Sequence, residues 1–418
     1  MRVLVVGSGA REHSLLWKIA QSPRRPELFA APGNAGTAEL ATNLEIPADD
    51  VDGLIESVNL NGIDLTVVGP ERPLALGIVD RFRAEGLRVF GATQAASRIE
   101  WSKAFSKRVM RAAGVPTADF EVFSDFELAS SYLRQHGAPV VIKADGLAAG
   151  KGVVVAQTLE EAKTALKEMI LDRKFGDAGS SVLIEDCLTG QELSVFCFTD
   201  GVSVSPLVAA CDYKRIHDGD KGPNTGGMGG YSPPPWWDAE MEQTIRETCI
   251  TPVVAQLRLD RMPYTGALYG GLMLTDEGPQ VIEFNARFGD PECQLIMPRL
   301  GNDLLDVIDA VLEGNVASLD LHWSNDATVG VVLASSGYPG AYEVGRTIAG
   351  ANDLPEGAVA FHAGTTAVDG MLVTSGGRVL TAVGRAPTMR QARALAYSAV
   401  SQITFEGVVT RKDIAGFV

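Results

Sequence analysis

The sequence predicts a multidomain protein of mixed α/β and α+β class, and three observations support this fold class. Strand-like and helix-like segments alternate through residues 1–100, which is typical of a doubly wound parallel sheet. A glycine-rich loop between two apolar runs marks a small lobe in residues 101–190, and hairpin signals follow in residues 191–325. Residues 326–418 return to strand-like runs with one helix, so we expect a small C-terminal α/β domain.

The N-terminal segment begins with the apolar run Val3–Val6, which turns at Gly7-Ser-Gly9 into a helical pattern over Glu12–Ala20. Ligands of parallel sheets bind at the carboxyl ends of the strands. Those ends carry small, polar and glycine-rich segments, namely Gly7–His13, Pro32–Thr37 and Gly69–Glu71. The Gly-x-Gly pattern is no dinucleotide fingerprint, because Glu12 occupies the position where a glycine or alanine packs the helix on the strand. The helix N-terminus can still hold an anion.

The most informative stretch reads Lys143-Ala-Asp-Gly-Leu-Ala-Ala-Gly-Lys151-Gly152. It is entered from Pro139–Ile142 and left by Val153–Ala156, so we expect a strand on each side. Ammonium groups and free backbone N–H groups suit a loop that covers phosphates. It is not a Walker A loop, because three residues instead of four separate its glycines and Gly152 follows the lysine. We therefore expect a nucleoside triphosphate site of another kind.

Residues 191–325 show the pattern of antiparallel strands. Asp200-Gly201 is a hairpin signal between the runs Leu193–Phe198 and Val202–Ala209. The segment Gly222–Gly230 shows no periodicity, and we expect a long loop there, which in a compact domain is usually functional. A helix over Met241–Leu257 and two strands around Asp276–Gly278 follow.

Glu283, Asn285 and Arg287 follow an apolar strand, and the two-residue period of a strand places them on one face. Carboxylate and amide oxygens suit Mg²⁺, which takes one or two protein ligands besides phosphate oxygens and water. The guanidinium could hold a transferring phosphoryl group. A solvated strand face with an incidental ion pair is the alternative, and the glycine loop and the following Gly289–Glu292 weigh against it.

Two weaker patterns leave alternatives open. Glu185–Leu188 ends an apolar strand and could frame an adenine, although taken alone a plain strand end explains it better. Asp212–Arg215 contains two adjacent cations, which indicate either a negative ligand or a surface charge cluster. Gly-x-Ser-x-Gly is absent and the histidines show no ligand spacing, so a hydrolase triad is not expected.

Composition argues against several classes of partner and location. The formal net charge is −16, so we expect neither nucleic acid nor an anionic membrane as a partner. Five cysteines without CxxC spacing indicate reduced thiols in a cytoplasmic protein. The N-terminus has no signal-peptide pattern, and no apolar run approaches the length of a membrane span. We expect a monomer.

These residues together resemble a known family. Lys143–Gly152 is similar to the glycine-rich loop of ATP-grasp enzymes, and Pro223–Gly229 and Glu283–Glu292 resemble signatures of the phosphoribosylamine–glycine ligase family. The resemblance extends over almost the whole chain, through Gly9–His13, Ala31–Thr37, Val68–Glu71, Ser102–Phe105 and Gly337–Gly340. It implies an N-terminal substrate-binding domain over 1–100, an ATP-grasp fold over 101–325 with a mobile lid lobe at 120–188, and a C-terminal domain over 326–418.

The family joins glycine to phosphoribosylamine at the expense of ATP, in purine biosynthesis, through a glycyl phosphate. Mg²⁺ or Mn²⁺ is implied as the metal. The resemblance implies ATP contacts at Lys103, Lys143, Gly150, Lys151, Gly152, Glu185, Leu188 and Glu192. It implies metal ligands at Glu283 and Asn285, and sugar-phosphate contacts at Gly9, Arg11, Glu12, Asn34, Gly36, Thr37 and Glu71. Arg287 would stabilise the transferring phosphoryl group, and Asp212, Lys214 and Asn224 would surround glycine and the reactive amine.

The chain departs from the family pattern at three places, of which Trp101, in place of a small residue before Ser102, has no obvious effect on the chemistry. Cys187 stands at the adenine hinge, where a bulky apolar residue is common, and Tyr269–Met273 offers no second carboxylate one strand before Glu283. Two other functions stay open, an ATP-grasp enzyme with a different acid or amine and an inactive nucleotide-binding protein. The intact set of Lys143, Glu283, Asn285 and Arg287 argues against the inactive protein.

Overall fold

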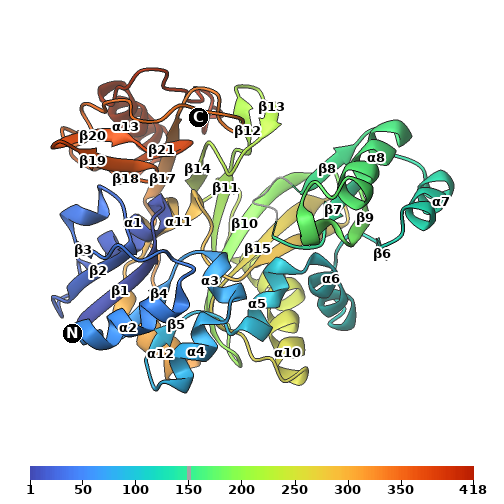
Figure 1. The fold of residues 1–418 in the computed structure, drawn as a ribbon, viewed down its shortest axis with the longest axis horizontal. Coiled ribbons are helices and arrows are strands. Elements are labelled where there is room, and N and C mark those ends of the chain that lie inside the picture. Colours follow the sequence, from blue (N-terminus) through green and yellow to red (C-terminus); the bar gives the residue numbers. More distant parts are fainter. Residues whose placement is uncertain (148–151) are drawn as a thin grey trace.

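The N-terminal segment forms a five-stranded parallel sheet in the order β3-β2-β1-β4-β5 in the computed structural model, which describes residues 1–147 and 152–418 (Figure 1). Its strands are β1 (Arg2–Gly7), β2 (Glu27–Pro32), β3 (Thr42–Asn43), β4 (Leu65–Val68) and β5 (Val89–Phe90). Its helices are α1 (Ala10–Ile19), α2 (Val51–Asn61), α3 (Glu71–Ala75) and α4 (Ile78–Ala84). The predicted doubly wound parallel sheet is confirmed. Residues 74–84 have the apolar spacing of a helix, but the structure divides this segment at Gly77, whose φ of 82° only glycine adopts readily.

The order of this sheet determines where its ligand edge lies. β1 runs between β2 and β4, so the segments that follow Gly7, Pro32 and Val68 leave the sheet side by side. Val3 to Val6 are fully buried because both faces of the sheet are covered, which explains their continuous apolar run.

A separate lobe projects from the body at the right of Figure 1. Two helices, α5 (Gln94–Trp101) and α6 (Lys103–Ala112), lead into it. Its antiparallel sheet has the order β6-β9-β7-β8, from β6 (Phe120–Phe123), β7 (Val140–Ala144), β8 (Val153–Ala156) and β9 (Val182–Asp186). It carries α7 (Phe126–His136) and α8 (Leu159–Leu166). The lobe has its own core, which includes Leu133, Ile142, Leu166 and Ile184.

An eight-stranded sheet then runs from the central segment into the C-terminal segment without interruption, in the order β16-β15-β10-β11-β14-β17-β21-β18. The central strands are β10 (Gln191–Asp200), β11 (Val208–Asp212), β14 (Gly229–Ser232), β15 (Thr265–Thr275) and β16 (Gly278–Asn285). The C-terminal strands are β17 (Ala327–Ala334), β18 (Ala358–His362) and β21 (Arg378–Ala386). Hydrogen bonding between β14 and β17 therefore crosses the division expected near residue 325.

The segment 222–230, expected as a loop, is partly strand. β12 (Arg215–His217) pairs with β13 (Lys221–Asn224), and β14 begins at Gly229, so only residues 225–228 connect them. The sequence does not predict these strands because glycine is uncommon in strands. Here the glycines are required because two backbones lie very close together. A Cβ on Gly230 would lie 2.3 Å from the carbonyl oxygen of Cys211.

The remaining helices cover the large sheet and the C-terminal segment. They are α9 (Ala239–Ile245), α10 (Thr251–Leu259), α11 (Glu292–Ile296), α12 (Leu304–Leu312) and α13 (Met389–Gln402). A π-helical turn over Arg246–Ile250 joins α9 to α10, as the single predicted helix over 241–257 requires. A small hairpin, β19 (Thr365–Val368) with β20 (Met371–Thr374), completes the fold. Within the described ranges, no helix is both long and apolar enough to cross a membrane.

A buried histidine pair joins α1 to the C-terminal segment. The backbone N–H of His362 donates to Nδ1 of His13 at 2.9 Å, so His13 must be neutral to accept this bond. Burial lowers the pKa of His13 to about 3 and that of His362 to about 4. Both values lie below the ordinary histidine pKa, so the unfolded chain takes up protons that the folded chain does not.

Stability should therefore fall as the pH falls from about 6.5 toward 4, by about 1.4 kcal/mol per pH unit for each histidine. His13→Asn keeps an acceptor near the position of Nδ1 but does not titrate. We expect the urea midpoint of this variant to change less than that of the wild type between pH 7 and pH 5. Parallel midpoints for the two proteins across this range would contradict the prediction.

Candidate active site

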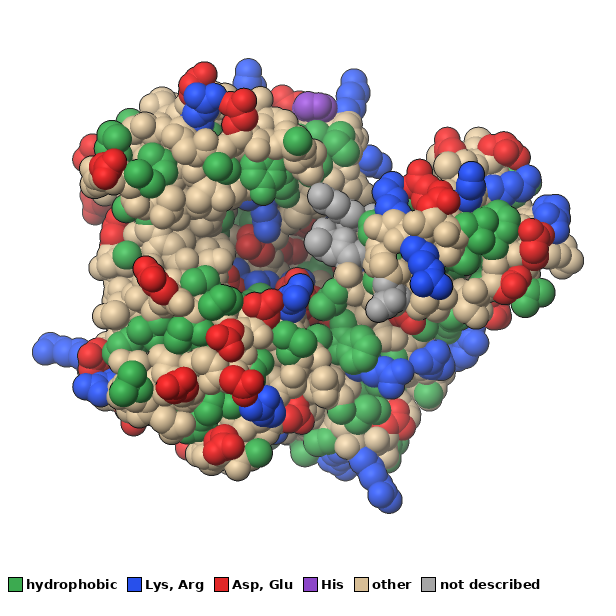
Figure 2. All heavy atoms as spheres, in the orientation of Figure 1, with side chains coloured by type: hydrophobic (Ala, Val, Ile, Leu, Met, Phe, Trp, Pro, Cys, Tyr) green, Lys and Arg blue, Asp and Glu red, His purple; other side chains and the backbone are tan. Residues whose placement is uncertain are grey.

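The surface is hollowed between the body and the projecting lobe, and acidic and basic side chains gather in the hollow (Figure 2). Glu283 of β16 is surrounded by charged side chains. Its burial alone would raise its pKa, but Lys143, Lys214, Lys103 and Arg287 outweigh burial and hold the pKa below its ordinary value. Four cations therefore lie near one carboxylate, and a polyphosphate could bind them in place of the carboxylates that pair with Lys143, Lys214 and Arg287.

Glu185 at the end of β9 is clamped between two lysines. One carboxylate oxygen lies 2.9 Å from Nζ of Lys143 on β7 and 3.1 Å from Nζ of Lys107 on α6. All three side chains are buried. The other oxygen, Oε1, is buried and has no hydrogen-bond partner among residues 1–147 and 152–418. A buried acceptor without a donor is costly, so this atom fits a ligand that brings an N–H group, such as the amine of adenine.

Lys103 begins α6 beside the glycine-rich loop. Its Nζ donates to the carbonyl oxygen of Gly146 at 3.3 Å, and burial together with nearby Lys143 lowers its pKa. The carbonyl of Gly152 accepts from the N–H of Ala144 at 2.8 Å, which closes the start of the β7–β8 hairpin. Gly150 and Lys151, also expected at ATP, lie outside the described residues.

Arg287 follows β16 and lies between two carboxylates. Nη2 is 2.7 Å from Oε1 of Glu100, and Nε donates to Oε2 of Glu71 at 3.3 Å. Burial opposes ionisation of Glu71, but Arg287 and Arg11 lower its pKa to about 2. The arginine is thus held by anions on α3 and α5.

A second cluster of polar side chains lies next to Glu283. A cavity of about 10 Å³ is lined by polar groups of Glu192, Ser194, Lys214, Tyr269 and Glu283. Lys214 pairs with Glu192 and is also attracted by Asp212. Ser194 Oγ donates to Oε1 of Glu292 at 3.2 Å, and burial and Asp212 raise the pKa of Glu292 to about 7. Carboxylates in such a place suit a substrate amine, which they can bind or deprotonate.

The start of α1 already holds a carboxylate of the protein, contrary to the expectation of an open anion site. Oε2 of Glu12 accepts from the N–H of Gly9 at 2.6 Å, as in a capping box, and Arg11 pairs with the other oxygen. The side-chain oxygen of Asn34 likewise accepts hydrogen bonds from the backbone N–H groups of Gly36 and Thr37. Glu12 and Glu71 remain able to accept from hydroxyl groups of a sugar.

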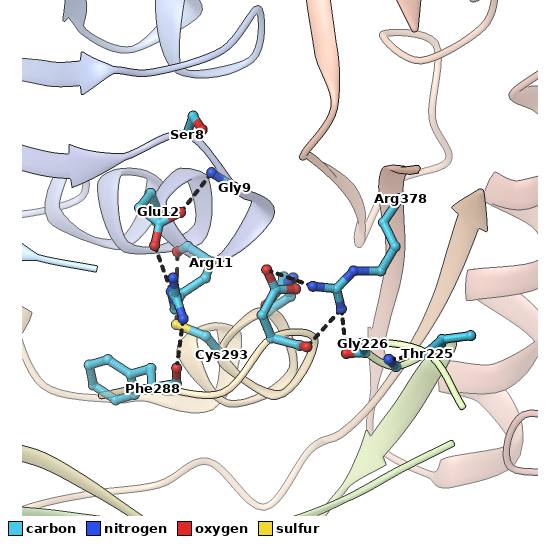
Figure 3. A network of polar contacts seen from close by, with 12 residues as sticks. Ser8, Gly9, Arg11, Glu12, Thr225, Gly226, Phe288, Cys293 and Arg378 are labelled. Atoms are coloured by element: carbon cyan, nitrogen blue, oxygen red, sulfur yellow. Dashed lines mark hydrogen bonds and ion pairs between the residues drawn. The ribbon is translucent and has the colours of Figure 1, made fainter. Parts of the chain in front are cut away.

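The C-terminal segment also reaches this region, as Figure 3 shows for Arg378 of β21. Nη1 of Arg378 donates to the carbonyl oxygens of Gly226 and Asp290 at 2.6 and 2.7 Å, and Nη2 pairs with the Asp290 carboxylate at 3.3 Å. The N–H of Gly226 donates to the hydroxyl of Tyr338 at 3.0 Å. The connection 225–228 is therefore held from the C-terminal side.

Not every predicted site residue lies in these clusters. Asn224 is exposed on β13 opposite Arg215, whose guanidinium donates to Gly222 and not into the hollow. Leu188 and Cys187 are half-buried after β9. Residues that sequence reasoning missed are Glu100, Lys107, Glu292 and Arg378. Two of them had a usable signal, since Lys107 lies one helical turn after Lys103 and Glu292 ends the segment Gly289–Glu292.

The oxygen ligands fit a metal that is shared with phosphate. In residues 1–147 and 152–418, no three His, Cys, Asp or Glu side chains converge as a complete metal site. Glu283 and Asn285 supply one carboxylate and one amide oxygen at the end of β16, and Gly271 stands opposite Glu283 on β15. Mg²⁺ bound to phosphates needs no more protein ligands than this.

Comparison with known proteins identifies the domains. Three families match in order: "Phosphoribosylglycinamide synthetase, N domain" over residues 1–100, its "ATP-grasp (A) domain" over 101–293 and its "C domain" over 328–416. A phosphoribosylamine–glycine ligase of Halalkalibacterium halodurans is 50% identical, covering 99% of this chain and 96% of that protein. One of Ralstonia nicotianae is 48% identical, covering 99% and 98%.

Solved structures agree with these matches. The crystal structure of a phosphoribosylamine–glycine ligase from Thermotoga maritima has a TM-score of 0.85 at 35% identity and covers 99% of this chain and 100% of its own. The biotin carboxylase domain of a Hydrogenobacter thermophilus 2-oxoglutarate carboxylase has a TM-score of 0.75 at 16% identity, covering 98% and 91%. This more distant likeness shows the ATP-grasp fold alone.

Proposed function

The chain belongs to the phosphoribosylglycinamide synthetase family, and we propose on this basis that it joins glycine to phosphoribosylamine with ATP, giving glycinamide ribonucleotide, ADP and phosphate. This is a step of purine biosynthesis. One observation supports it above the others: a carboxylate and an amide oxygen for a metal end the same strand, and Lys103, Lys143, Lys214 and Arg287 surround that carboxylate. An ATP-dependent ligase needs this combination to neutralise a polyphosphate and transfer its γ-phosphoryl group.

The first step would phosphorylate the glycine carboxylate, whose oxygen attacks the γ-phosphorus as ADP leaves. Lys143 and Lys103 would hold the phosphates, and Glu185 and Leu188 would frame the adenine, with Glu192 at the ribose. Gly150, Lys151 and Gly152 would cover the phosphates, as the family loop does. Arg287 would stabilise charge on the transferring group, which is electrostatic work that needs no protein nucleophile.

Glu283 and Asn285 would hold Mg²⁺ or Mn²⁺, which would supply positive charge to neutralise the phosphates.

The second step would be attack of the sugar amine on the acyl phosphate, which expels phosphate and leaves an amide. The sugar phosphate would lie along Gly9, Arg11, Glu12, Asn34, Gly36, Thr37 and Glu71. Asp212, Lys214 and Asn224 would surround glycine and the amine. Glu292, whose pKa is raised by burial to about 7, would take the proton that the amine loses.

We also propose a monomer in the cytoplasm. The free state of all five cysteines supports a reducing compartment.

The test of this function is coupled ADP release from the purified protein with Mg²⁺ and ATP, omitting glycine or freshly prepared phosphoribosylamine in turn. We expect release only when both are present, and formation of glycinamide ribonucleotide in equal amount. Release with another acid or amine, but not with this pair, would reassign the substrates. ATP binding without any turnover would favour a nucleotide-binding protein.

A further inference from the structure

Glu100 contacts two consecutive residues beyond the proposed metal ligand Asn285. Its Oε2 accepts from the backbone N–H of Ala286 at 2.7 Å, and its Oε1 pairs with Nη2 of Arg287 at 2.7 Å. The Glu100 side chain is 6% exposed, and α5, which carries it, packs against β16. One carboxylate thus fixes both the backbone and the guanidinium at the point where the strand ends.

Glu71 holds the same guanidinium differently. Its oxygen lies farther away, at 3.3 Å from Nε, and its side chain is 33% exposed against 6% for Glu100. Glu71 is therefore more accessible than Glu100, and a ligand can compete for it more readily. The two ion pairs differ in strength and in access.

A fully structural explanation of Glu100 is weak on energetic grounds. A buried ion pair rarely stabilises a fold more than apolar side chains of the same volume would. Burial raises the pKa of Glu100 to about 7 even beside Arg287. Keeping this carboxylate charged therefore lowers the free energy of unfolding. Such costs are concentrated at functional sites.

We propose that Glu100 is a positioning residue that keeps Arg287 directed at the transferring phosphoryl group when phosphoribosylamine occupies Glu71. The inference rests on the proposed function, because it gives Arg287 and Glu71 the roles assigned there. Without the Glu100 charge, Arg287 turns wholly to Glu71, so the phosphoryl group loses its guanidinium and the sugar loses its carboxylate. ATP, which contacts neither carboxylate, binds as before.

The experiment compares Glu100→Gln and Glu100→Asp in the full-length protein, with Glu85→Gln on the exposed end of α4 as the matched control. For Glu100→Gln we expect kcat to fall about tenfold or more and KM for phosphoribosylamine to rise, with the Kd for ATP within about twofold. Glu100→Asp keeps the charge and should retain more turnover than Glu100→Gln. The control should match the wild type.

A structural role predicts the opposite order, because glutamine keeps the size of the side chain and the bond to Ala286. Turnover of Glu100→Gln near that of the wild type, or no better in Glu100→Asp than in Glu100→Gln, overturns the inference. If Glu100→Gln does not fold, Glu100→Met, which also removes the charge, takes its place: reduced kcat with unchanged ATP binding supports the role, and unchanged kcat rejects it. Failure of the proposed function itself is distinct, since the wild type would then not require both substrates.

Discussion

Arg287→Ala should lower turnover about a hundredfold or more and leave ATP binding nearly unchanged. The guanidinium is held between Glu71 and Glu100, and in the proposed mechanism its charge stabilises the negative charge that develops on the phosphoryl group. A group used mainly in the transition state affects kcat more than substrate binding. The measurement is coupled ADP release together with the Kd for ATP by calorimetry.

The fold should tolerate this change. Removal of the arginine leaves Glu100 buried without its cation, but burial already brings the Glu100 pKa to about 7, so the carboxyl can take a proton. Arg81→Ala, which removes only a surface pair with Asp52, is the matched control. Turnover of Arg287→Ala close to that of Arg81→Ala would remove Arg287 from the mechanism.

Lys143→Met should weaken ATP binding about tenfold to a hundredfold, since hydrogen bonds to charged groups contribute about 1.5–3 kcal/mol. The substitution deletes one of the cations around Glu283 and preserves most of the packing of the buried stem. Lys107 still neutralises Glu185, so the end of β9 should keep its structure. The Kd for ATP, measured with Mg²⁺ by calorimetry, checks this result.

Lys163→Met is the control for this prediction. Lys163 belongs to the same lobe and pairs with Glu160 at 3.0 Å on the surface of α8. An ATP dissociation constant of Lys143→Met equal to that of Lys163→Met would show that Lys143 serves only to pair with Glu185.

Local patterns predicted much of the fold because they depend on neighbours in sequence. The alternation of strands and helices in residues 1–100 predicted the parallel sheet, and the hairpins around Asp200-Gly201 and Asp276–Gly278 followed from turn residues. The strands within 215–232 were missed, because Gly229 and Gly230 pair there for reasons of close approach that composition does not reveal.

The site was predictable where its residues lie on one strand. Glu283, Asn285 and Arg287 share a face through the period of β16, so their association needed no tertiary information. Glu100 and Arg378 come from distant segments, 187 and 91 positions from Arg287, and only the fold brings them to it or to its neighbours. Glu12 was understood as a mismatch to a dinucleotide fingerprint, but its function as a helix cap depended on the rotamer that it adopts.

The eight-stranded sheet has a consequence for how this chain can be divided. The boundary between the ATP-grasp and C-terminal parts runs along a ladder of backbone hydrogen bonds between β14 and β17. Every residue of both strands is buried, so cleavage of the chain between them followed by separation would expose two apolar edges that recruit strands from other molecules. The C-terminal part therefore cannot be exchanged by itself. Chimaeras with relatives should exchange it together with β14, the strand that pairs with β17.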